Sequence, residues 1–276
     1  MIRPAESDLR DFYHTPLGAV VCRRLRRRIC YFWSDICGET RQMTESAKQQ
    51  RVLGVGYVTP YLLPFLQKTC RGNDVVAQPL AVTPFQDGVQ RWPSHGANSV
   101  TTSLEEQLPF TDDMFDRVLL VHSLEHSDAP QQLLEEAWRI LKPHGKILIV
   151  VPNRLSIWAR VEATPFGNGH PYSFGQLERL MNKHKFKIKA HEVALFLPPS
   201  QSRFILKTSD YLRRGLRLFS SFGGVLIIEA EKQLYAPTQS GTKAPVVSMK
   251  EVVSSSLRSS RSHNHDSSCS SDNSCD

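Results

Sequence analysis

The chain has 276 residues, of which 40% are hydrophobic and 22% are charged, and its formal net charge is +7. This length suffices for one sizeable α/β domain with appendages or for two small domains. The composition excludes a fibrous or wholly disordered protein. The longest apolar runs, such as residues 146–152, are too short to cross a bilayer, and the polar start lacks a signal-peptide core. We therefore expect a cytoplasmic protein.

The six cysteines form no CxxC pair. Four are scattered between residues 22 and 70, and two lie in a polar stretch near the end of the chain. This spacing predicts neither a zinc site nor a disulfide framework, so no metal is expected.

Residues 1–50 are predicted to form a helical extension followed by a polar connector. Apolar residues recur there at helical spacing with arginines between them: Val20, Val21, Leu25, Ile29, Phe32 and Ile36. One interpretation is that the basic face of this helix contacts nucleic acid or an anionic membrane surface. The other is a helix packed on the domain with its arginines in solvent. We favour the second, because no aromatic platform accompanies the arginines.

Residues 51–236 alternate strands and helices in the way that predicts a parallel sheet. The predicted strands are 51–55, 74–78, 100–102, 117–121, 146–151, 187–193 and 224–230. The predicted helices are 59–68, 129–141 and 174–183. Two of the strands are continuously apolar, which indicates that both faces of the sheet are covered. The fold class is therefore α/β, with a doubly wound Rossmann-like sheet.

Residues 237–276 are rich in serine and contain no aromatic residue. Such a segment cannot bury enough apolar surface to offset its ordering entropy, so we predict that it is disordered.

The most specific pattern lies in residues 108–154, LPFTDDMFDRVLLVHSLEHSDAPQQLLEEAWRILKPHGKILIVVPNR. A turn and an acidic pair precede a buried strand that ends in HSLEH, and a helix, an LKPHG turn and a second buried strand follow. Asp128 is the expected N-cap of the helix. Lys142 and Pro143 are expected to end it, with Gly145 free to adopt a positive φ.

This arrangement resembles the class I S-adenosylmethionine-dependent methyltransferases of the type 11 group, whose segments read LPF-x-D-x-x-FD-x-V, LEH and R-x-LKPGG. The resemblance covers residues 51–235. It implies a seven-stranded sheet, mostly parallel with an antiparallel last strand, and S-adenosylmethionine as cofactor. It also implies methyl transfer to an acceptor, a small molecule or a macromolecule, that the sequence does not identify.

The resemblance also exposes a departure in the loop after the first strand. The family carries a D-x-G-x-G-x-G pattern there; Gly54 stands at the position of the acid, Gly56 keeps its glycine, and Val58 and Pro60 replace two others. Pro60 removes an amide that a pyrophosphate would need, whereas S-adenosylmethionine has no phosphate. The loop is therefore stronger evidence against NAD as the ligand than against S-adenosylmethionine. Gly54, Gly56 and Tyr57 are predicted to contact the cofactor.

The acids that the family places on the next two strands are also displaced. The second predicted strand offers Gln78, with no carboxylate before Asp87, and the acid near the adenine would align with Leu104. His122 follows a strand at the edge where open α/β sheets bind ligands. The predicted cofactor residues beyond the loop are Gln78, Glu105, Glu106, His122 and Leu124.

The long connection at residues 151–181 predicts a lid or an acceptor site. Its predicted acceptor-binding residues are Asn153, Arg154, Trp158 and Tyr172. Histidine titrates near neutrality, so it suits a base that takes the acceptor's proton. The candidate bases are His122, His126 and His170.

Two alternatives to an active methyltransferase remain. A catalytically degenerate methyltransferase-like protein would bind or regulate a partner, which the lost glycines and the lost ribose acid favour. A dinucleotide oxidoreductase fits less well, because the loop fails G-x-G-x-x-G at its third glycine.

Overall fold

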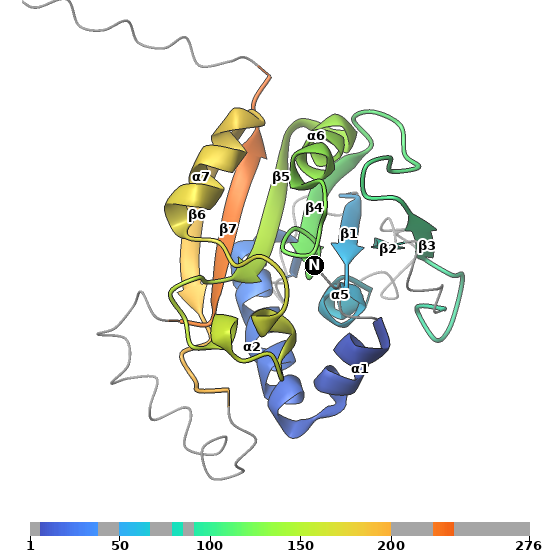
Figure 1. Ribbon diagram of the computed structural model, residues 1–276. Helices are drawn as coiled ribbons and strands as arrows, with labels where there is room; N and C mark the ends of the chain where they lie inside the picture. The colour runs from blue at the N-terminus through green and yellow to red at the C-terminus, as the bar shows by residue number, and fades with distance from the viewer. Residues whose placement is uncertain (1–5, 38–49, 67–78, 85–90, 200–222, 235–276) are drawn as a thin grey trace, which may run out of the picture. The chain divides into compact units, whose positions relative to one another are not determined.

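The computed structural model describes residues 6–37, 50–66, 79–84, 91–199 and 223–234 (Figure 1). Residues Met1–Tyr235 make up one compact unit. Several predictions fall outside the described residues: the strand at 74–78 with Gln78, the substitute acid Asp87, and the disordered tail at 237–276.

The described residues form a seven-stranded sheet with the order β3-β2-β1-β4-β5-β7-β6. Strands β1 to β5 run parallel, and β7 is antiparallel to β5 and β6. The predicted fold class is therefore confirmed. The bounds are β1 Val52–Gly56, β2 Leu80–Pro84, β3 Val100–Ser103, β4 Phe115–Val121, β5 Leu141–Pro152, β6 Phe186–Ala194 and β7 Val225–Lys232.

Helices cover both faces of this sheet (Figure 1). One buried apolar cluster joins α2 and α5 to the sheet, and a second joins α6 and α7 to it. The described helices are α1 Glu6–His14, α2 Pro16–Phe32, α3 Ser34–Cys37, α5 Thr59–Leu66, α6 Pro130–Ile140 and α7 Phe174–Lys183, with short 3₁₀ turns η2 Trp158–Arg160 and η3 Pro165–Gly167. The sequence analysis predicted α2, α5, α6 and α7 but not α1.

Helix α2 packs on the domain. Thr15 caps it by accepting a hydrogen bond from the Gly18 amide at 3.0 Å, and Leu25 lies fully buried beneath it. Its arginines also contact the domain, since Arg26 donates to the Pro60 carbonyl at 2.7 Å and Arg28 lies 3.3 Å from the Glu192 carboxylate. The packing of α2 agrees with the favoured interpretation, but Arg26 and Arg28 contact the domain instead of lying wholly in solvent. Nucleic-acid binding stays untested.

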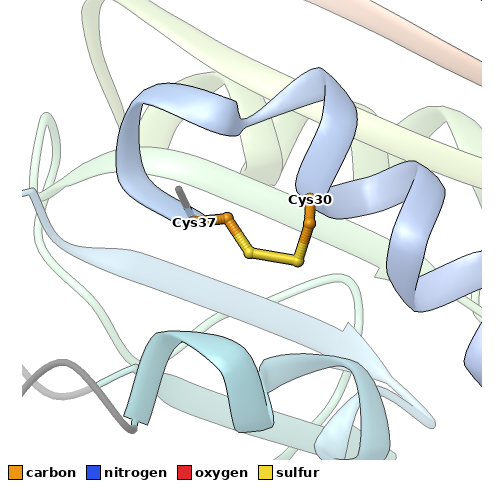
Figure 2. The surroundings of a disulfide bond; sticks show 2 residues. All are labelled: Cys30 and Cys37. Atoms are coloured by element: carbon orange, nitrogen blue, oxygen red, sulfur yellow. A yellow bond between two sulfur atoms is a disulfide. The ribbon is translucent and has the colours of Figure 1, made fainter. Parts of the chain in front are cut away.

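A disulfide joins Cys30 to Cys37 (Figure 2), so the prediction that the cysteines form none is wrong for this pair. Helix α2 ends at Phe32 and α3 folds back after Trp33, which brings the two Cα atoms to 5.2 Å. That separation lies within the range that a disulfide spans.

Two predicted helix ends are also wrong in detail. The N-cap of α6 is Ala129, whose amide donates a hydrogen bond to Ser127 Oγ at 3.3 Å, so Asp128 does not cap the helix. After α6 the positive φ of 61° falls on His144 instead of Gly145. Gly145 is needed for space, because a Cβ there would lie 2.8 Å from the Lys142 carbonyl oxygen.

Arg139 explains why an LPF turn and an R-x-LKP segment occur together. Its guanidinium donates to the carbonyls of Leu108 and Phe110 at 3.1 and 2.8 Å and to Asp112 at 2.7 Å. Glu136 completes the network by accepting from Arg139 at 2.7 Å and from the Leu108 amide at 2.8 Å. The helix thereby fixes the turn that leads into β4.

Replacing Glu136 with glutamine is expected to lower the free energy of unfolding at pH 7 by about 1 kcal/mol, a value discounted for partial exposure. The hydrogen bond with Arg139, which outweighs burial, holds the pKa of Glu136 below its usual value. A lowered carboxyl pKa contributes stability above the unfolded pKa, and this contribution disappears as pH falls through the folded pKa. Urea unfolding at pH 7 and about pH 3 should therefore show the difference shrinking in acid. Exposed Glu178→Gln is the control, and a difference independent of pH would contradict the assignment.

Candidate functional site

The candidate site lies at the carboxyl ends of the parallel strands. In Figure 1 the arrowheads of β1 and β5 point to the edge beside which α1 lies. Gly56 ends β1 with a φ of +92°, and a Cβ there would lie 2.4 Å from the Val121 carbonyl oxygen and 2.9 Å from Ser123 Cβ. Gly56 is therefore required by the close approach of β1 to the end of β4.

The two departures from the family's loop pattern lie against each other. Val58 is fully buried, and its Cγ2 would lie 2.5 Å from a Cβ added at Gly54. The valine side chain thus fills the space above Gly54 that any larger residue at that position would need. We expect neither residue to have changed independently of the other.

Aromatic side chains from distant parts of the chain gather next to the loop. The Tyr13 hydroxyl of α1 lies 2.7 Å from His122 Nε2 and receives a hydrogen bond from the Tyr61 hydroxyl at 2.7 Å. The Tyr13 ring stacks on Tyr57, with centroids 5.2 Å apart. Burial raises the pKa of both Tyr13 and Tyr61 well above the usual value, so both hydroxyls stay protonated at neutral pH.

The HSLEH segment after β4 forms a tight turn with buried side chains. The His126 amide donates to the Ser123 carbonyl at 3.0 Å, and His122 has a positive φ of 52°. His122 Nδ1 lies 3.1 Å from Glu125 Oε1. Burial alone would raise the pKa of Glu125, but the hydrogen bond with His122 and the charge interactions with His126 and His122 outweigh it and lower that pKa. Glu125 is therefore a buried carboxylate between two imidazoles.

Polar side chains also lie near the end of β2 and directly after β3. Thr83 lies near the end of β2 with 4% exposure, and its Oγ1 has no hydrogen-bond partner among the described residues. Glu105 is buried and accepts from Ser123 Oγ at 3.4 Å, whereas Glu106 is exposed. The side chain of Leu124, another predicted cofactor residue, lies in the apolar cluster beneath α6.

The predicted acceptor residues divide into two groups. Asn153 and Trp158 are buried and donate to the carbonyls of Gly223 and Leu197 at 2.9 and 2.7 Å, so they hold the loop in place. Arg154 and His170 are exposed. Tyr172 is buried as well, with 7% exposure. Burial, and then the charge of Glu125, raise its pKa to about 12.

His170 joins this loop to the HSLEH turn. Its amide donates to the Glu125 carbonyl at 2.7 Å, and its ring meets the edge of Tyr172 at a centroid distance of 5.4 Å. The candidate base His170 is thus the only one of the three predicted histidines that the structure leaves exposed.

The chemistry of this edge fits S-adenosylmethionine. Ser123 approaches both Gly56 and Glu105, and Thr83 near the end of β2 holds a buried oxygen that lacks a hydrogen-bond partner among the described residues and that a ribose hydroxyl would satisfy. An outer aromatic face suits a sulfonium cation, but Tyr13 and Tyr57 each turn one face to the other. Sequence analysis missed Thr83, because the second strand was expected at residues 74–78, and missed Tyr13 with α1.

Residues 52–149 match a family model described as a methyltransferase domain, which confirms the resemblance over that region. A ubiquinone/menaquinone biosynthesis C-methyltransferase of Rickettsia felis is 24% identical over 136 residues, covering 47% of this chain and 52% of the relative. An uncharacterised protein of Methanocaldococcus jannaschii is 33% identical over 135 residues, covering 46% and 58%. The chain thus spans little more than half the length of these curated relatives.

Among solved structures, an S-adenosylmethionine-dependent methyltransferase of Thermotoga maritima, described as a possible histamine N-methyltransferase, is similar with a TM-score of 0.48 and 18% identity. The alignment covers 83% of this chain and 96% of that one. In the part of the chain that the structure describes, no helix has the length and apolar character needed to cross a membrane.

Proposed function

We propose that the protein transfers a methyl group from S-adenosylmethionine to an acceptor, because residues 52–149 match a family model described as a methyltransferase domain. The observation that carries this proposal is the polar edge at the carboxyl ends of β1, β2 and β4, where Ser123 approaches both Gly56 and Glu105. Ligands of open α/β sheets bind at this edge. A cytoplasmic location stays a prediction.

In this proposal Thr83 and Glu105 bind the ribose and the adenine side of the cofactor, and Tyr57 with Tyr13 faces its sulfonium. When bound, S-adenosylmethionine supplies an electrophilic methyl group, and the transfer needs mainly alignment of the acceptor with it. The residue types at the edge match these tasks, because hydroxyl and carboxylate oxygens bind ribose hydroxyls and aromatic faces attract cations.

We assign the acceptor side to the exposed Arg154 and His170 of the loop after β5, together with the buried Tyr172. Arg154 and Tyr172 would position the acceptor, and the His170 imidazole would take its proton. His122 is less suited to this task, since its Nε2 and Nδ1 already lie at 2.7 and 3.1 Å from Tyr13 and Glu125. His126 is buried, so an acceptor has less access to it than to His170.

Titration calorimetry of the full chain with S-adenosylmethionine and S-adenosylhomocysteine tests the proposal. We expect binding of both ligands and none of NADH. Glu105→Gln should weaken binding about 10-fold to 100-fold, because it removes a charged hydrogen-bond acceptor, whereas the exposed Glu106→Gln is the matched control. Absence of binding near millimolar ligand would refute the enzyme function.

One observation favours the alternative of a catalytically inactive binding protein. Tyr13 stacks on Tyr57 and hydrogen-bonds His122, so α1 occupies part of the edge that the cofactor needs. The same titrations decide between the two functions, because an inactive scaffold closed by α1 would bind neither adenosyl ligand. Recovery of binding in Tyr13→Ala would support that closure.

A further inference from the structure

We infer that His122, Glu125 and His126 bind a divalent transition-metal ion of the zinc class. The three residues each offer one ligand atom, and these atoms all lie within 4.8 Å of one another. The cysteine spacing, which lacks a CxxC pair, predicted no metal site. This inference does not rest on the proposed methyl transfer, since the ion would bind with or without the methyl donor.

The spacing of the ligand atoms suits such an ion. With metal–ligand bonds of about 2.0–2.1 Å, neighbouring ligands of a tetrahedral site lie about 3.3 Å apart. His122 Nδ1 and Glu125 Oε1 lie 3.1 Å apart, so this pair is already in place. The His126 ring stands nearly parallel to that of His122, with a centroid separation of 6.2 Å. A small rotation of the His126 side chain would complete the set.

The donor types narrow the choice of ion. Two imidazoles and one carboxylate are found at zinc sites that keep a position open for water or substrate, and also at non-haem iron sites. Calcium and magnesium prefer all-oxygen ligands, which this cluster does not offer. The single carboxylate leaves the ion with a net positive charge, which favours an anionic or strongly polarised oxygen as the fourth ligand.

Glu125 provides an independent sign that something is bound here. The residue has 2% exposure, and its Oε2 has no hydrogen-bond partner among the described residues. A buried carboxylate oxygen in this state loses its hydration without replacement. A cation held between Glu125 and the imidazoles would supply the missing interaction.

Neighbouring residues hold the candidate ligands by hydrogen bonds, in the way that is common at metal sites. A metal-bound histidine commonly donates its other ring N–H to a neighbouring oxygen. Here a His122 bound through Nδ1 would carry its proton on Nε2 and donate to the Tyr13 hydroxyl, which Tyr61 also contacts. The positive φ of 52° at His122 is a strained conformation for a residue other than glycine, and such strain concentrates at functional sites.

Gly169 closes the cluster on the side of the acceptor loop. A Cβ at this position would lie 2.6 Å from His126 Nδ1 and 2.6 Å from the Glu125 carbonyl oxygen. The loop can therefore approach the imidazole this closely only because residue 169 is a glycine with a φ of +90°. The resulting enclosure keeps bulk water away from the ligands.

The test is Zn²⁺ titration of the chelator-treated full chain at fixed pH, with Co²⁺ as a spectroscopic probe. We expect about one tightly bound equivalent, a rise in melting temperature, and the visible absorption of a four-coordinate Co²⁺ site. Glu125→Gln and His126→Gln should abolish this signal. Tyr13→Phe, which removes one hydroxyl, should weaken binding about 10-fold to 100-fold.

Two controls change histidines that lie outside the proposed cluster. His95→Gln changes an exposed residue on a separate loop, and His263→Gln with His265→Gln changes the tail. Neither should alter the high-affinity signal. Loss of that signal in the tail variant, its survival in Glu125→Gln, or no binding at all would overturn the inference. Should Glu125→Gln fail to fold, Tyr13→Phe decides. Methyl-donor titration is a separate readout, so either proposal can fail alone.

Discussion

Replacing Gly56 with alanine is expected to lower the free energy of unfolding by about 3 kcal/mol or more. The residue has a φ of +92°, and the new Cβ would lie 2.4 Å from the Val121 carbonyl oxygen. Relief requires moving the backbone of β4, because a carbonyl has no rotamer to adopt. Urea or thermal unfolding monitored by circular dichroism measures the loss.

Two other glycines separate the causes of this loss. Gly96 has a φ of +98° with nothing within 4 Å of an added Cβ, so Gly96→Ala should cost about 1–2 kcal/mol from backbone strain alone. Gly175 lies in α7 with open space and no positive φ, so Gly175→Ala should stabilise by about 0.5–1 kcal/mol. Equal losses of unfolding free energy in Gly56→Ala and Gly96→Ala would contradict the prediction that the clash of the new Cβ adds to the backbone strain at Gly56.

The expected stability changes of these glycine variants determine how ligand-binding experiments on the loop should be interpreted. Gly56 is required by the approach of β1 to Val121 whether or not a cofactor binds. A variant at Gly56 that no longer binds S-adenosylmethionine could therefore have lost its fold. Substitutions such as Glu105→Gln, which leave the strands untouched, give a cleaner measure of cofactor contact.

The sequence was most informative where local signals agreed with tertiary packing. Helix α7 was predicted with its observed bounds, and in the structure Ser173 and Gln176 form a reciprocal capping box in front of an apolar stripe, so that local signals and packing agree. The continuous apolar runs located β4 and β5, because this local pattern likewise agrees with burial of both strands in the sheet. Strand β2 was missed, since its five residues include a proline and carry no alternating pattern.

The site was less accessible from sequence, because its contacts are long-range. Tyr13 and His122 are 109 residues apart, and α1 has only Leu9 as a buried anchor among its described side chains, too weak a stripe to predict a helix. The HSLEH segment was located by its place after a strand. The side chains of His122, Glu125 and His126 converge because this segment forms a tight turn. The spacing of these residues in the sequence does not reveal that turn.

The departures in the cofactor loop should behave as one coupled change. Val58→Gly alone is expected to cost about 2–4 kcal/mol, because it leaves a cavity above Gly54. Gly54→Ala alone should cost about 1–3 kcal/mol, because its Cβ would lie 2.5 Å from Val58 Cγ2. The double variant should be less destabilised than the sum by about 1–3 kcal/mol, since glycine at 58 removes that contact. Unfolding free energies of the four proteins measure the coupling.

Gly54→Ala combined with Gly175→Ala is the additive control, because α7 packs in the other apolar cluster. Additive losses at Gly54 and Val58 would mean that the loop rearranges around each change separately. Coupling would mean that the space above Gly54 and the buried Val58 side chain are packed as one unit. The divergent loop is then a repacked cofactor edge, and its missing glycines do not by themselves argue against binding of the methyl donor.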